Sequence, residues 1–335
     1  MISQSVIFQH IYVMTNYIKH QLRYILHRTL NLYGEYIISK RKHFTPKIII
    51  HIDGGLGSQM WQYALGYCAS RLSGLAVEYD TSWFKKYGKD INRNFNRNLN
   101  FPHIFTNIVF NEATTKDAEF YRKYFYYYSN YYCKYVPEFL SSKKPRYLGL
   151  YYTNYRYIDN FRYELKNMLQ LDVSLLTGNN IEILSTIKNA KIPIAVHVRR
   201  GDFVKSAHDV TTPVYFNKAI QFLQNKFGTQ RATFFIFTND YDFTKKIFNN
   251  FQGNFYYVNG NDNDHEANDM ILMGQCRHFV ISNSNFSWWP AYLATNSDKL
   301  VIAPDHWFNK NAPLSMRKYN ETAWICDGWI TLPTE

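Results

Sequence analysis

The sequence predicts an α/β protein whose two domains are each built on a parallel, doubly wound sheet. Strand-like and helix-like segments alternate along the chain, and repeated β-α-β units with short connections produce such sheets. The 335 residues exceed a single typical core, and 46% of them are apolar against 19% charged. This composition excludes a mainly disordered chain. Only 15 glycines and 10 prolines also exclude a low-complexity or collagen-like protein.

The first part of the body carries four elements in succession. They are a buried strand, a glycine-rich loop, a helix and a second strand, at residues 47–53, 54–57, 58–72 and 75–80. Residues 85–100 are polar and predict a surface loop. Residues 120–135 are crowded with tyrosine, whose rings either pack in the core or form a platform for a sugar acceptor.

The second part repeats the alternation more regularly. It predicts strands at 192–198, 232–238, 254–258, 278–281 and 299–303, separated by helices at 215–227, 241–251, 267–277 and 284–296. A turn at 177–180 marks the boundary between the two parts. The predicted organisation is therefore an N-terminal extension at 1–46, a first α/β domain at 47–185 and a second at 186–335.

The N-terminal extension is strongly basic and has helical periodicity. The net charge of the chain is +12, and residues 1–47 hold seven Lys and Arg residues against the single acid Glu35. Polar residues interrupt the first 18 positions, so no membrane-spanning helix is predicted. An amphipathic helix is predicted from apolar residues that recur mostly every three or four positions: Ile7, Ile11, Ile18, Leu22, Ile25, Leu26 and Leu30. This helix either docks on the protein's own body or lies, through residues 1–45, on an anionic membrane surface.

The cysteine pattern bears on the compartment. Cys68, Cys133, Cys276 and Cys326 form no C-x-x-C pair and no Cys/His cluster with zinc spacing. Neither a disulfide scaffold nor a structural zinc site is predicted, and free thiols are typical of a reducing compartment. The sequence therefore predicts a cytoplasmic protein with peripheral contact to the cytoplasmic face of a membrane.

Three polar segments follow predicted strands, where ligands of such sheets bind. The first is Gly54–Gln59 (GGLGSQ). It lacks the third glycine of a dinucleotide fingerprint and the Gly-Lys of a P-loop, so neither cofactor is predicted. Its glycines let the backbone approach a ligand, and the start of the next helix offers N–H groups to an anion. A tight structural turn is the alternative.

The second segment is His197–Asp202 (HVRRGD), directly after a predicted strand. Arg199 and Arg200 are adjacent, and the planar guanidinium group binds two phosphate oxygens at once. The alternatives are a structural ion pair with Asp202 and, for His197, a hydrogen-bonded core residue.

The third segment is Ser282–Ser287 (SNSNFS), which follows a strand and opens a helix. Small polar side chains and unpaired N–H groups at a helix N-terminus can bind an anion. In the alternative, Ser284 or Asn285 caps the helix, and both roles can hold together. Asp262–Glu266 contains the D-x-D pattern of metal-dependent sugar-nucleotide enzymes, but a solvated loop and no metal site are predicted there.

In this order, the three segments resemble the motifs of the α-1,2-fucosyltransferases of glycosyltransferase family 11. The opening motif of that family is matched by Gly54–Gly66 (GGLGSQMWQYALG) and its central H-x-R-R-x-D by His197–Asp202. Its serine-rich, double-Trp segment is matched by Ser282–Leu293 (SNSNFSWWPAYL), followed by Ile302–Asn309 (IAPDHWFN). The resemblance covers residues 48–310 and leaves the N-terminal extension outside.

The resemblance implies a fold and a reaction. The fold is the glycosyltransferase B architecture, in which two Rossmann-like domains face a cleft. The reaction transfers L-fucose from GDP-fucose to the 2-hydroxyl of a galactose-containing glycan, with inversion and without a metal or other cofactor. Such a product belongs to surface polysaccharide or glycan synthesis, and the C-terminal domain would hold the donor.

The resemblance also implies roles for individual residues. Arg199 and Arg200 would face the diphosphate and act as catalytic cations in place of a metal. Asp202, His208 and Asp209 are the candidates for the base that inversion requires. Contacts with the guanine, ribose and diphosphate are implied for His197, Asp269, Ser284, Asn285, Phe286 and Ser287, and contacts with the sugar and acceptor for Gly55, Gly57 and Gln59.

Two other functions remain open at this stage. The phosphate contacts do not identify the hexose, so a transferase that uses another GDP-sugar is one alternative. A non-enzymatic nucleic-acid-binding protein is the other, because the chain is basic and interleaves Tyr with Lys and Arg. No nucleic-acid motif is present in the sequence and much of the charge lies in one extension, so a nucleic-acid partner is not predicted.

Overall fold

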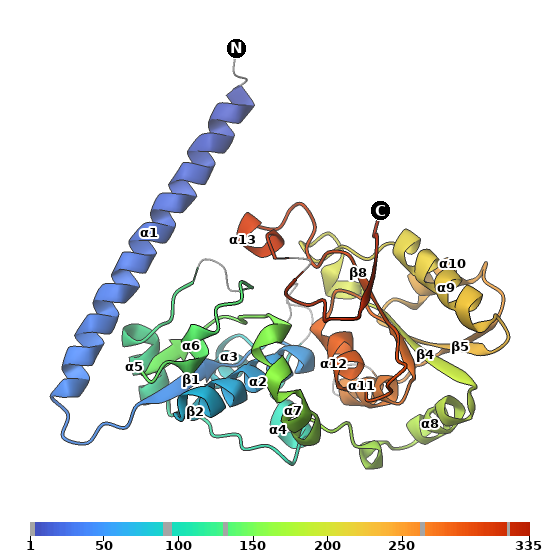
Figure 1. Ribbon diagram of the computed structural model, residues 1–335, viewed down its shortest axis with the longest axis horizontal. Helices are drawn as coiled ribbons and strands as arrows, with labels where there is room; N and C mark the ends of the chain where they lie inside the picture. The colour runs from blue at the N-terminus through green and yellow to red at the C-terminus, as the bar shows by residue number, and fades with distance from the viewer. Residues whose placement is uncertain (1–3, 90–95, 130–132, 262–264, 320–321) are drawn as a thin grey trace.

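The computed structural model describes residues 4–89, 96–129, 133–261, 265–319 and 322–335 (Figure 1). It is an α/β fold with two parallel sheets and a long N-terminal helix. The smaller sheet has three strands in the order β2-β1-β3, with β1 (Lys47–His51) between β2 (Ala76–Asp80) and β3 (Arg146–Leu148). The predicted strands and helix of this part are confirmed, but α2 (Leu56–Ser73) begins two residues early, so Leu56 and Gly57 belong to its first turn.

The larger sheet has six parallel strands in the order β6-β5-β4-β7-β8-β9. Its strands are β4 (Ile192–Val198), β5 (Ala232–Thr238), β6 (Asn254–Tyr257), β7 (His278–Val280), β8 (Val301–Pro304) and β9 (Ile330–Leu332). The five strands predicted from the sequence are confirmed, and β9 is an addition. The chain starts in the middle at β4, moves outward to β6 and returns to the other side of β4 at β7. The reversal between β4 and β7 creates the crevice in which ligands of such sheets bind.

Helices cover both faces of the larger sheet. They are α8 (Asn179–Asn189), α9 (Pro213–Phe227), α10 (Tyr241–Phe248), α11 (Glu266–Gly274) and α12 (Asn285–Leu293). Because side chains alternate along a strand, Ile194 of β4 packs in the cluster with α9 and α10, while Ala195 packs in the cluster with α11 and α12. The second cluster continues into α2, so one apolar core joins the two sheets. Helix α8 spans the predicted boundary at 185/186 and packs against α11.

Shorter elements complete the body. They are α3 (Ser82–Lys86), α4 (Phe101–Ile104), α5 (Thr115–Tyr124), α6 (Glu138–Ser141), α7 (Arg162–Met168) and α13 (Leu314–Arg317), with 3-10 turns at Tyr155–Tyr157, Asp159–Phe161, Val173–Leu175 and Gly201–Phe203. All four cysteines are buried and free.

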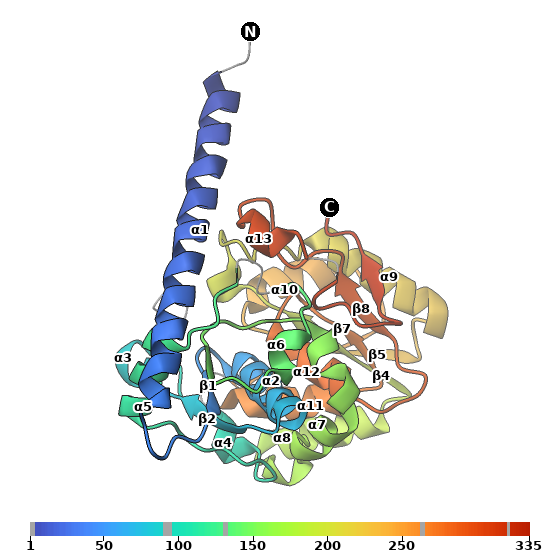
Figure 2. The same cartoon turned by 60° about the vertical axis from the view of Figure 1, so that its left-hand side comes forward.

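The predicted N-terminal helix is present as α1 (Gln4–Ser39). It packs against α5, and its N-terminal end extends beyond the body in both ribbon views (Figures 1 and 2). Within the described part of the chain, no helix is both long and apolar enough to cross a membrane. The tyrosine-rich segment lies beside α1, where Tyr126 stacks on His27 and Tyr124 touches Gly34, so these rings pack against a helix. Residues 130–132 of that segment lie outside the described residues.

Candidate active site

The second and third sequence motifs meet at the reversal of strand order. The Ser282 hydroxyl, directly beyond β7, accepts from the Arg199 backbone N–H at 3.0 Å and donates to the His197 carbonyl at 2.7 Å. The His197 ring nitrogen Nδ1 lies 2.9 Å from the Ser287 hydroxyl oxygen. These bonds join the ends of β4 and β7, so two segments more than 80 residues apart form one polar surface.

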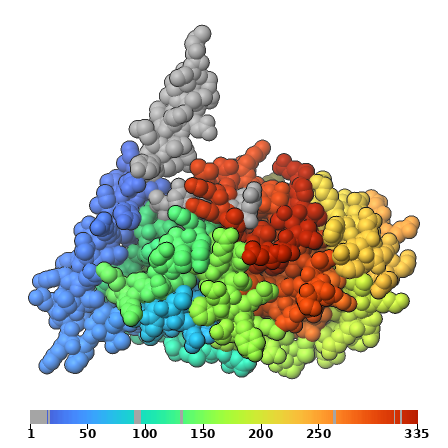
Figure 3. Space-filling view, viewed as in Figure 1, coloured from blue at the N-terminus to red at the C-terminus, as the bar shows by residue number. Residues whose placement is uncertain are grey.

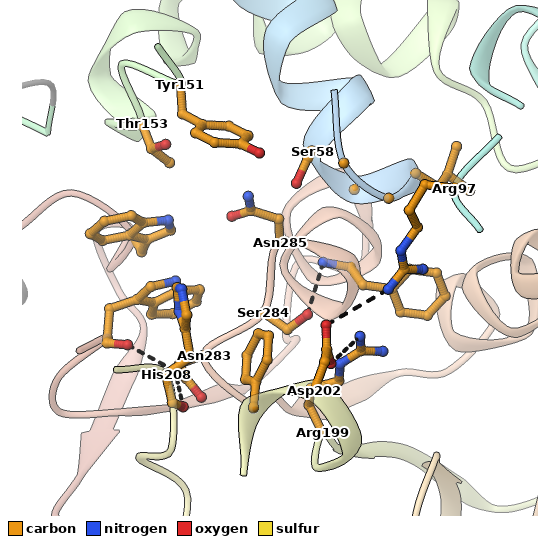
Figure 4. Close-up of a pocket in the computed structure, with 18 of the residues that line it drawn as sticks. Ser58, Arg97, Tyr151, Thr153, Arg199, Asp202, His208, Asn283, Ser284 and Asn285 are labelled. Carbon is orange, nitrogen blue, oxygen red and sulfur yellow. Dashed lines mark hydrogen bonds and ion pairs between the residues drawn. The ribbon is translucent and has the colours of Figure 1, made fainter. Parts of the chain in front are cut away.

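Two cavities border this surface. The first, of about 430 Å³, lies between the glycine-rich turn before α2 and the N-terminus of α12 (Figure 4). The second, of about 440 Å³, lies beyond the carboxyl ends of β4, β5 and β6. The two cavities share five lining residues, which we call the shared wall: Arg97, Arg199, Asp202, Glu266 and Phe286.

Opposite charges alternate along the shared wall. Arg199 Nη2 donates to Asp202 Oδ1 at 2.6 Å, and Asp202 Oδ2 lies 3.7 Å from Arg97 Nη2. Arg97 Nη1 in turn lies 3.7 Å from Glu266 Oε2. Arg97 thus comes from the segment after β2 of the smaller sheet and reaches Asp202 and Glu266, which belong to the side of the larger sheet. The two longer ion pairs leave this guanidinium loosely held, so an anionic ligand could compete with the carboxylates for it.

Arg200 does not lie beside Arg199 at the cavities, and it lines neither of them. Its guanidinium stacks over the Phe243 ring at 4.1 Å, and its Nη1 donates to Asp209 Oδ1 at 3.1 Å. Both arginines lie beyond the end of β4 at Val198, and the backbone turns at Arg200 (φ −127°, ψ −116°) into the 3-10 turn Gly201–Phe203, so the two side chains diverge. The implied role of Arg200 at the diphosphate is therefore not supported by its position.

Of the three base candidates, only His208 lines a cavity without an ion pair among the described residues. Asp202 is engaged by Arg199 and Arg97. Asp209 accepts from Arg200 and from the Lys205 backbone N–H at 2.8 Å, away from both cavities. Burial lowers the pKa of His208, which favours its neutral form.

Polar atoms without partners concentrate around the first cavity. Buried Nε of Arg199, Nδ1 of His208, Oδ1 of Asn283, Oδ1 of Asn285 and Nε1 of Trp324 have no hydrogen-bond partner in the part of the chain that is described. Buried polar groups are ordinarily paired, so such a group of exceptions is typical of a site that a ligand completes. Tyr151, Thr153 and Ser58 face the same space from the first sheet's side (Figure 4).

The second cavity combines a buried carboxyl with a neutral imidazole. Burial raises the pKa of Asp269 to about 7, and Asn261 Nδ2 donates to its Oδ1 at 2.8 Å. Burial and the Arg199 charge lower the pKa of His197 to about 3, so this ring is neutral at physiological pH. An ionised carboxylate has two acceptor oxygens and can therefore accept two parallel N–H donors from the edge of one heterocyclic ring.

Two predicted contact residues stand behind the cavity walls. Ser287 is buried and bonded to His197, and it lines neither cavity. Gln59 donates from Nε2 to the carbonyls of Gly54 at 3.0 Å and Asn98 at 2.9 Å. Gln59 therefore links Asn98, the residue after Arg97, to the glycine-rich turn, and its side chain does not reach the cavities. The other predicted contacts, Gly55, Gly57, Ser284, Asn285 and Phe286, line the first cavity, and Ser284 also caps α12 by accepting from the Phe286 N–H.

Gly57 makes the closest approach between α2 and α12. A Cβ atom there would lie 2.6 Å from Phe286 N and 2.7 Å from the Asn285 carbonyl carbon. The Trp289 indole N–H also donates to the Gly57 carbonyl at 2.9 Å. Gly57 therefore sets the distance between two helix N-termini at the cavity.

Gly57→Ala should lower the free energy of unfolding by roughly 3 kcal/mol, because the clash involves backbone atoms that cannot rotate away. Gly55→Ala is the matched control, since its Cβ would meet nothing closer than Arg97 Nη1 at 3.5 Å. That control should cost under about 1 kcal/mol. Urea denaturation of both variants measures the difference, and equal losses would contradict the role given to Gly57.

Sequence reasoning missed Arg97 and Glu266 of the shared wall, and Trp307 and Trp324 of the first cavity. Arg97 lies in the segment predicted as a surface loop, and Glu266 closes the acidic stretch predicted to be solvated. Glu266 instead begins α11 and accepts from the Leu56 N–H at 3.3 Å. Asp262, Asn263 and Asp264 lie outside the described residues. In the described ranges, no group of three or more His, Cys, Asp or Glu side chains is arranged to hold a metal ion.

Comparison with known proteins agrees with the motif resemblance. The chain is 29% identical over 310 residues to the O-antigen biosynthesis glycosyltransferase WbnK of Escherichia coli, which covers 84% of this chain and 99% of the relative. It is 26% identical over 282 residues to an alpha-1,2-colitosyltransferase of Escherichia coli, covering 78% of this chain and 93% of the relative. It is 25% identical over 149 residues to galactoside alpha-(1,2)-fucosyltransferase 2 of Rattus norvegicus, covering 42% of this chain and 40% of the relative.

The family model described as Glycosyl transferase family 11 matches residues 18–331, nearly the whole chain and all three motif segments. The match includes both sheets and every residue of the shared wall. The chain belongs to glycosyl transferase family 11.

Proposed function

We propose that this chain is an inverting, metal-independent glycosyltransferase that moves L-fucose from GDP-fucose to the 2-hydroxyl of a galactoside, in surface polysaccharide or glycan synthesis. The observation that carries the proposal is the shared wall, where two arginines separate two cavities of similar size. The guanosine would occupy the second cavity, and the hexose and acceptor the first. The diphosphate would lie at the wall between them.

The proposal includes a glycosyltransferase B arrangement, with an acceptor-side domain at 47–185 and a donor domain at 186–335. It is supported by the two parallel sheets and by the position of the first cavity between them. Gly54, Gly55 and Ser58 face that cavity from the smaller sheet's side, whereas Arg199 and Ser284 face it from the larger sheet's side. Donor and acceptor would therefore meet between groups from both sheets.

In the proposed reaction, the bond between the anomeric carbon of fucose and the β-phosphate oxygen breaks, and its electron pair leaves with GDP. The acceptor hydroxyl forms the new bond from the opposite face and gives its proton to a base, for which neutral His208 at the first cavity is the candidate. Negative charge grows on the departing phosphate, and cations already held in place stabilise that charge with little reorganisation. Arg199 is fixed in such a position by its bond to Asp202, and Arg97 lies at the same wall, where a bound phosphate would attract it.

A transfer assay tests this function. The purified chain is incubated in EDTA with GDP-fucose, GDP-mannose or UDP-galactose and a panel of β-galactosides, and the product linkage is determined by NMR. The proposal expects a product from GDP-fucose with an α-1,2 linkage. Transfer only in the presence of an added divalent cation, or transfer from UDP-galactose alone, would contradict it.

A transferase for another GDP-sugar is the second candidate. It is favoured by one observation, the similarity over 78% of the chain to a relative named for colitose transfer. Donor selection in the same assay separates the two candidates, because transfer from GDP-mannose in preference to GDP-fucose would favour a transferase for another GDP-sugar. Membership in a glycosyltransferase family favours either enzyme over the nucleic-acid-binding alternative.

Donor binding should depend on pH through Asp269. Burial raises the pKa of this carboxyl to about 7, so the empty site is partly protonated near neutrality. Guanine N–H donors favour the ionised carboxylate, so binding releases a proton and the affinity rises with pH. The Kd for guanosine should fall about tenfold between about pH 6 and about pH 8.

Calorimetry measures the pH dependence of the Kd for guanosine. Guanosine is the ligand of choice because it carries no phosphate that titrates in the same pH range. Asp269→Asn is the control and should bind weakly with a flat pH profile. A flat profile for the unmodified chain would show that Asp269 does not receive the base.

A further inference from the structure

We infer that α1 docks the protein on an anionic lipid bilayer surface through a stripe of apolar side chains that points away from the body. The inference starts from how α1 is attached. His20 Nδ1 lies 2.6 Å from the Tyr128 hydroxyl, and the His27 ring stacks on Tyr126 at 4.9 Å. Further along, Gly34 is buried against Tyr124. His20, His27 and Gly34 are seven residues apart and therefore lie on one face of the helix, which packs against tyrosines of the body.

A second face carries the apolar residues, and the body covers it only at its C-terminal part, where the Tyr33 ring lies 5.9 Å from the Tyr124 ring. Its members, the outward stripe, are 50 to 62% exposed: Ile18, Leu22, Ile25, Leu26, Leu32, Tyr33 and Tyr36. Their spacing of three, four and seven residues places them on one side of the helix, roughly opposite His27. In the space-filling view, the described part of α1 forms an edge of the molecule next to the α5 segment (Figure 3). The helix does pack on the body, as one sequence prediction has it, but it does so through the face of His27 and not through its main apolar face.

The charges around the outward stripe are mostly positive and therefore favour a negatively charged partner. Six exposed basic residues lie along the helix and its C-terminal end: Lys19, Arg23, Arg28, Lys40, Arg41 and Lys42. Lys19 and Arg28 flank the outward stripe, whereas Arg23 lies on the His27 side and Arg41 stacks over the Phe120 ring at 4.4 Å. The single acid, Glu35, is already paired with Lys144 at 2.7 Å. An apolar stripe edged by cations is the pattern of a helix that lies in the headgroup region of an anionic bilayer. A second copy of the chain would bring the same positive charges together, so charge complementarity favours lipid.

The length and attachment of α1 suit this geometry. Contacts at His20, His27 and Gly34 hold this stretch of the 36-residue helix against the body, so the outward stripe keeps a fixed orientation. Among the side chains that the structure describes, none from α1 lines either cavity, so attachment to a bilayer leaves both open. Binding through the stripe and donor binding are therefore separable properties.

Vesicle sedimentation with the full chain tests the inference. The chain is mixed with vesicles of phosphatidylcholine alone or containing about a third phosphatidylglycerol. We expect it to sediment with the anionic vesicles and not with the neutral ones. The variant L22E/I25E should bind at least about tenfold more weakly, because charged groups cannot enter the acyl boundary. K19Q/R23Q/R28Q should lose roughly fivefold per residue, and added salt should weaken binding of the unmodified chain.

Val109→Glu is the matched control, because Val109 is 74% exposed and lies outside α1. It should bind vesicles as the unmodified chain does, and all variants should keep their circular dichroism and GDP affinity. Absence of binding to anionic vesicles would overturn the inference, as would equal binding by L22E/I25E. Sedimentation velocity provides the remaining check, since a dimer that L22E/I25E converts to a monomer would assign the stripe to self-association instead.

Discussion

Arg199→Ala should lower kcat for sugar transfer by roughly 10²–10³-fold, the usual effect of removing one preorganised group that stabilises transition-state charge. Arg199 lines both cavities, and its position is fixed by two bonds that do not involve a ligand. Its backbone N–H donates to Ser282, and its Nη2 donates to Asp202 at 2.6 Å. The guanidinium is therefore already placed when the phosphate charge develops.

Arg200→Ala is the matched control, because it removes an identical charge at the next position. Its guanidinium is held by Phe243 and Asp209 away from both cavities. We expect less than about tenfold loss of kcat for this variant, with a lower stability from the lost stacking and ion pair. Steady-state kinetics and urea denaturation of both variants provide the comparison. A loss in Arg200→Ala as large as that in Arg199→Ala would contradict the separation of the two arginines.

Arg97→Ala should lower kcat by about 10²-fold, by the same argument of charge stabilisation. Arg97 approaches the wall from the other side of the cleft, and its side chain is only 18% exposed. It sits between Asp202 and Glu266 at 3.7 Å from each, which is long for a charge-assisted hydrogen bond. A phosphate that enters between these groups would attract Arg97 at close range. Arg97→Lys should recover part of the activity, because lysine keeps the charge but loses the planar fork.

Lys86→Ala is the control for Arg97, because it removes a neighbouring exposed cation outside both cavities. It should leave kcat unchanged. The role of Arg97 would be disproved if its alanine variant lost only stability, with kcat and the Kd for GDP as in the unmodified chain.

The sequence predicts the larger sheet well for a physical reason. Strands β4 and β5 lie in the middle of a parallel sheet and are covered on both faces, so they form continuous apolar runs with sharp ends. Strand β9 has only three residues at the edge of the sheet, which is too short for a periodic signal. The sequence places Leu56 and Gly57 in the loop before α2, because glycine is unfavourable in a helix, whereas the structure includes them in its first turn.

The site divides in the same way. Motifs that directly follow parallel strands lie at the crevice, because the carboxyl ends of these strands share one edge of the sheet. Arg199 after β4 and Ser284 after β7 are examples. Arg97 could not be found from its own segment, which has no periodicity and is held by the bonds from Gln59 to the Asn98 carbonyl and from the Arg97 N–H to the Gly88 carbonyl. The separation of Arg199 from Arg200 could not be predicted, because both lie beyond β4, where the backbone turns at Arg200 (φ −127°, ψ −116°). The sequence could not predict which face of α1 packs against the body, because that face is determined by contacts with Tyr126 and Tyr128, which are distant in the sequence.

The central claim is that the shared wall receives a diphosphate. Calorimetric titration with GDP and GMP, in EDTA, measures that directly, because the two ligands differ only in the β-phosphate. The account predicts that GDP binds roughly 10- to 100-fold more tightly than GMP, as expected for charge-assisted hydrogen bonds to one added phosphate. Arg199→Ala should remove most of that difference while leaving the affinity for GMP nearly unchanged. Equal affinities for GDP and GMP in the unmodified chain would contradict the account.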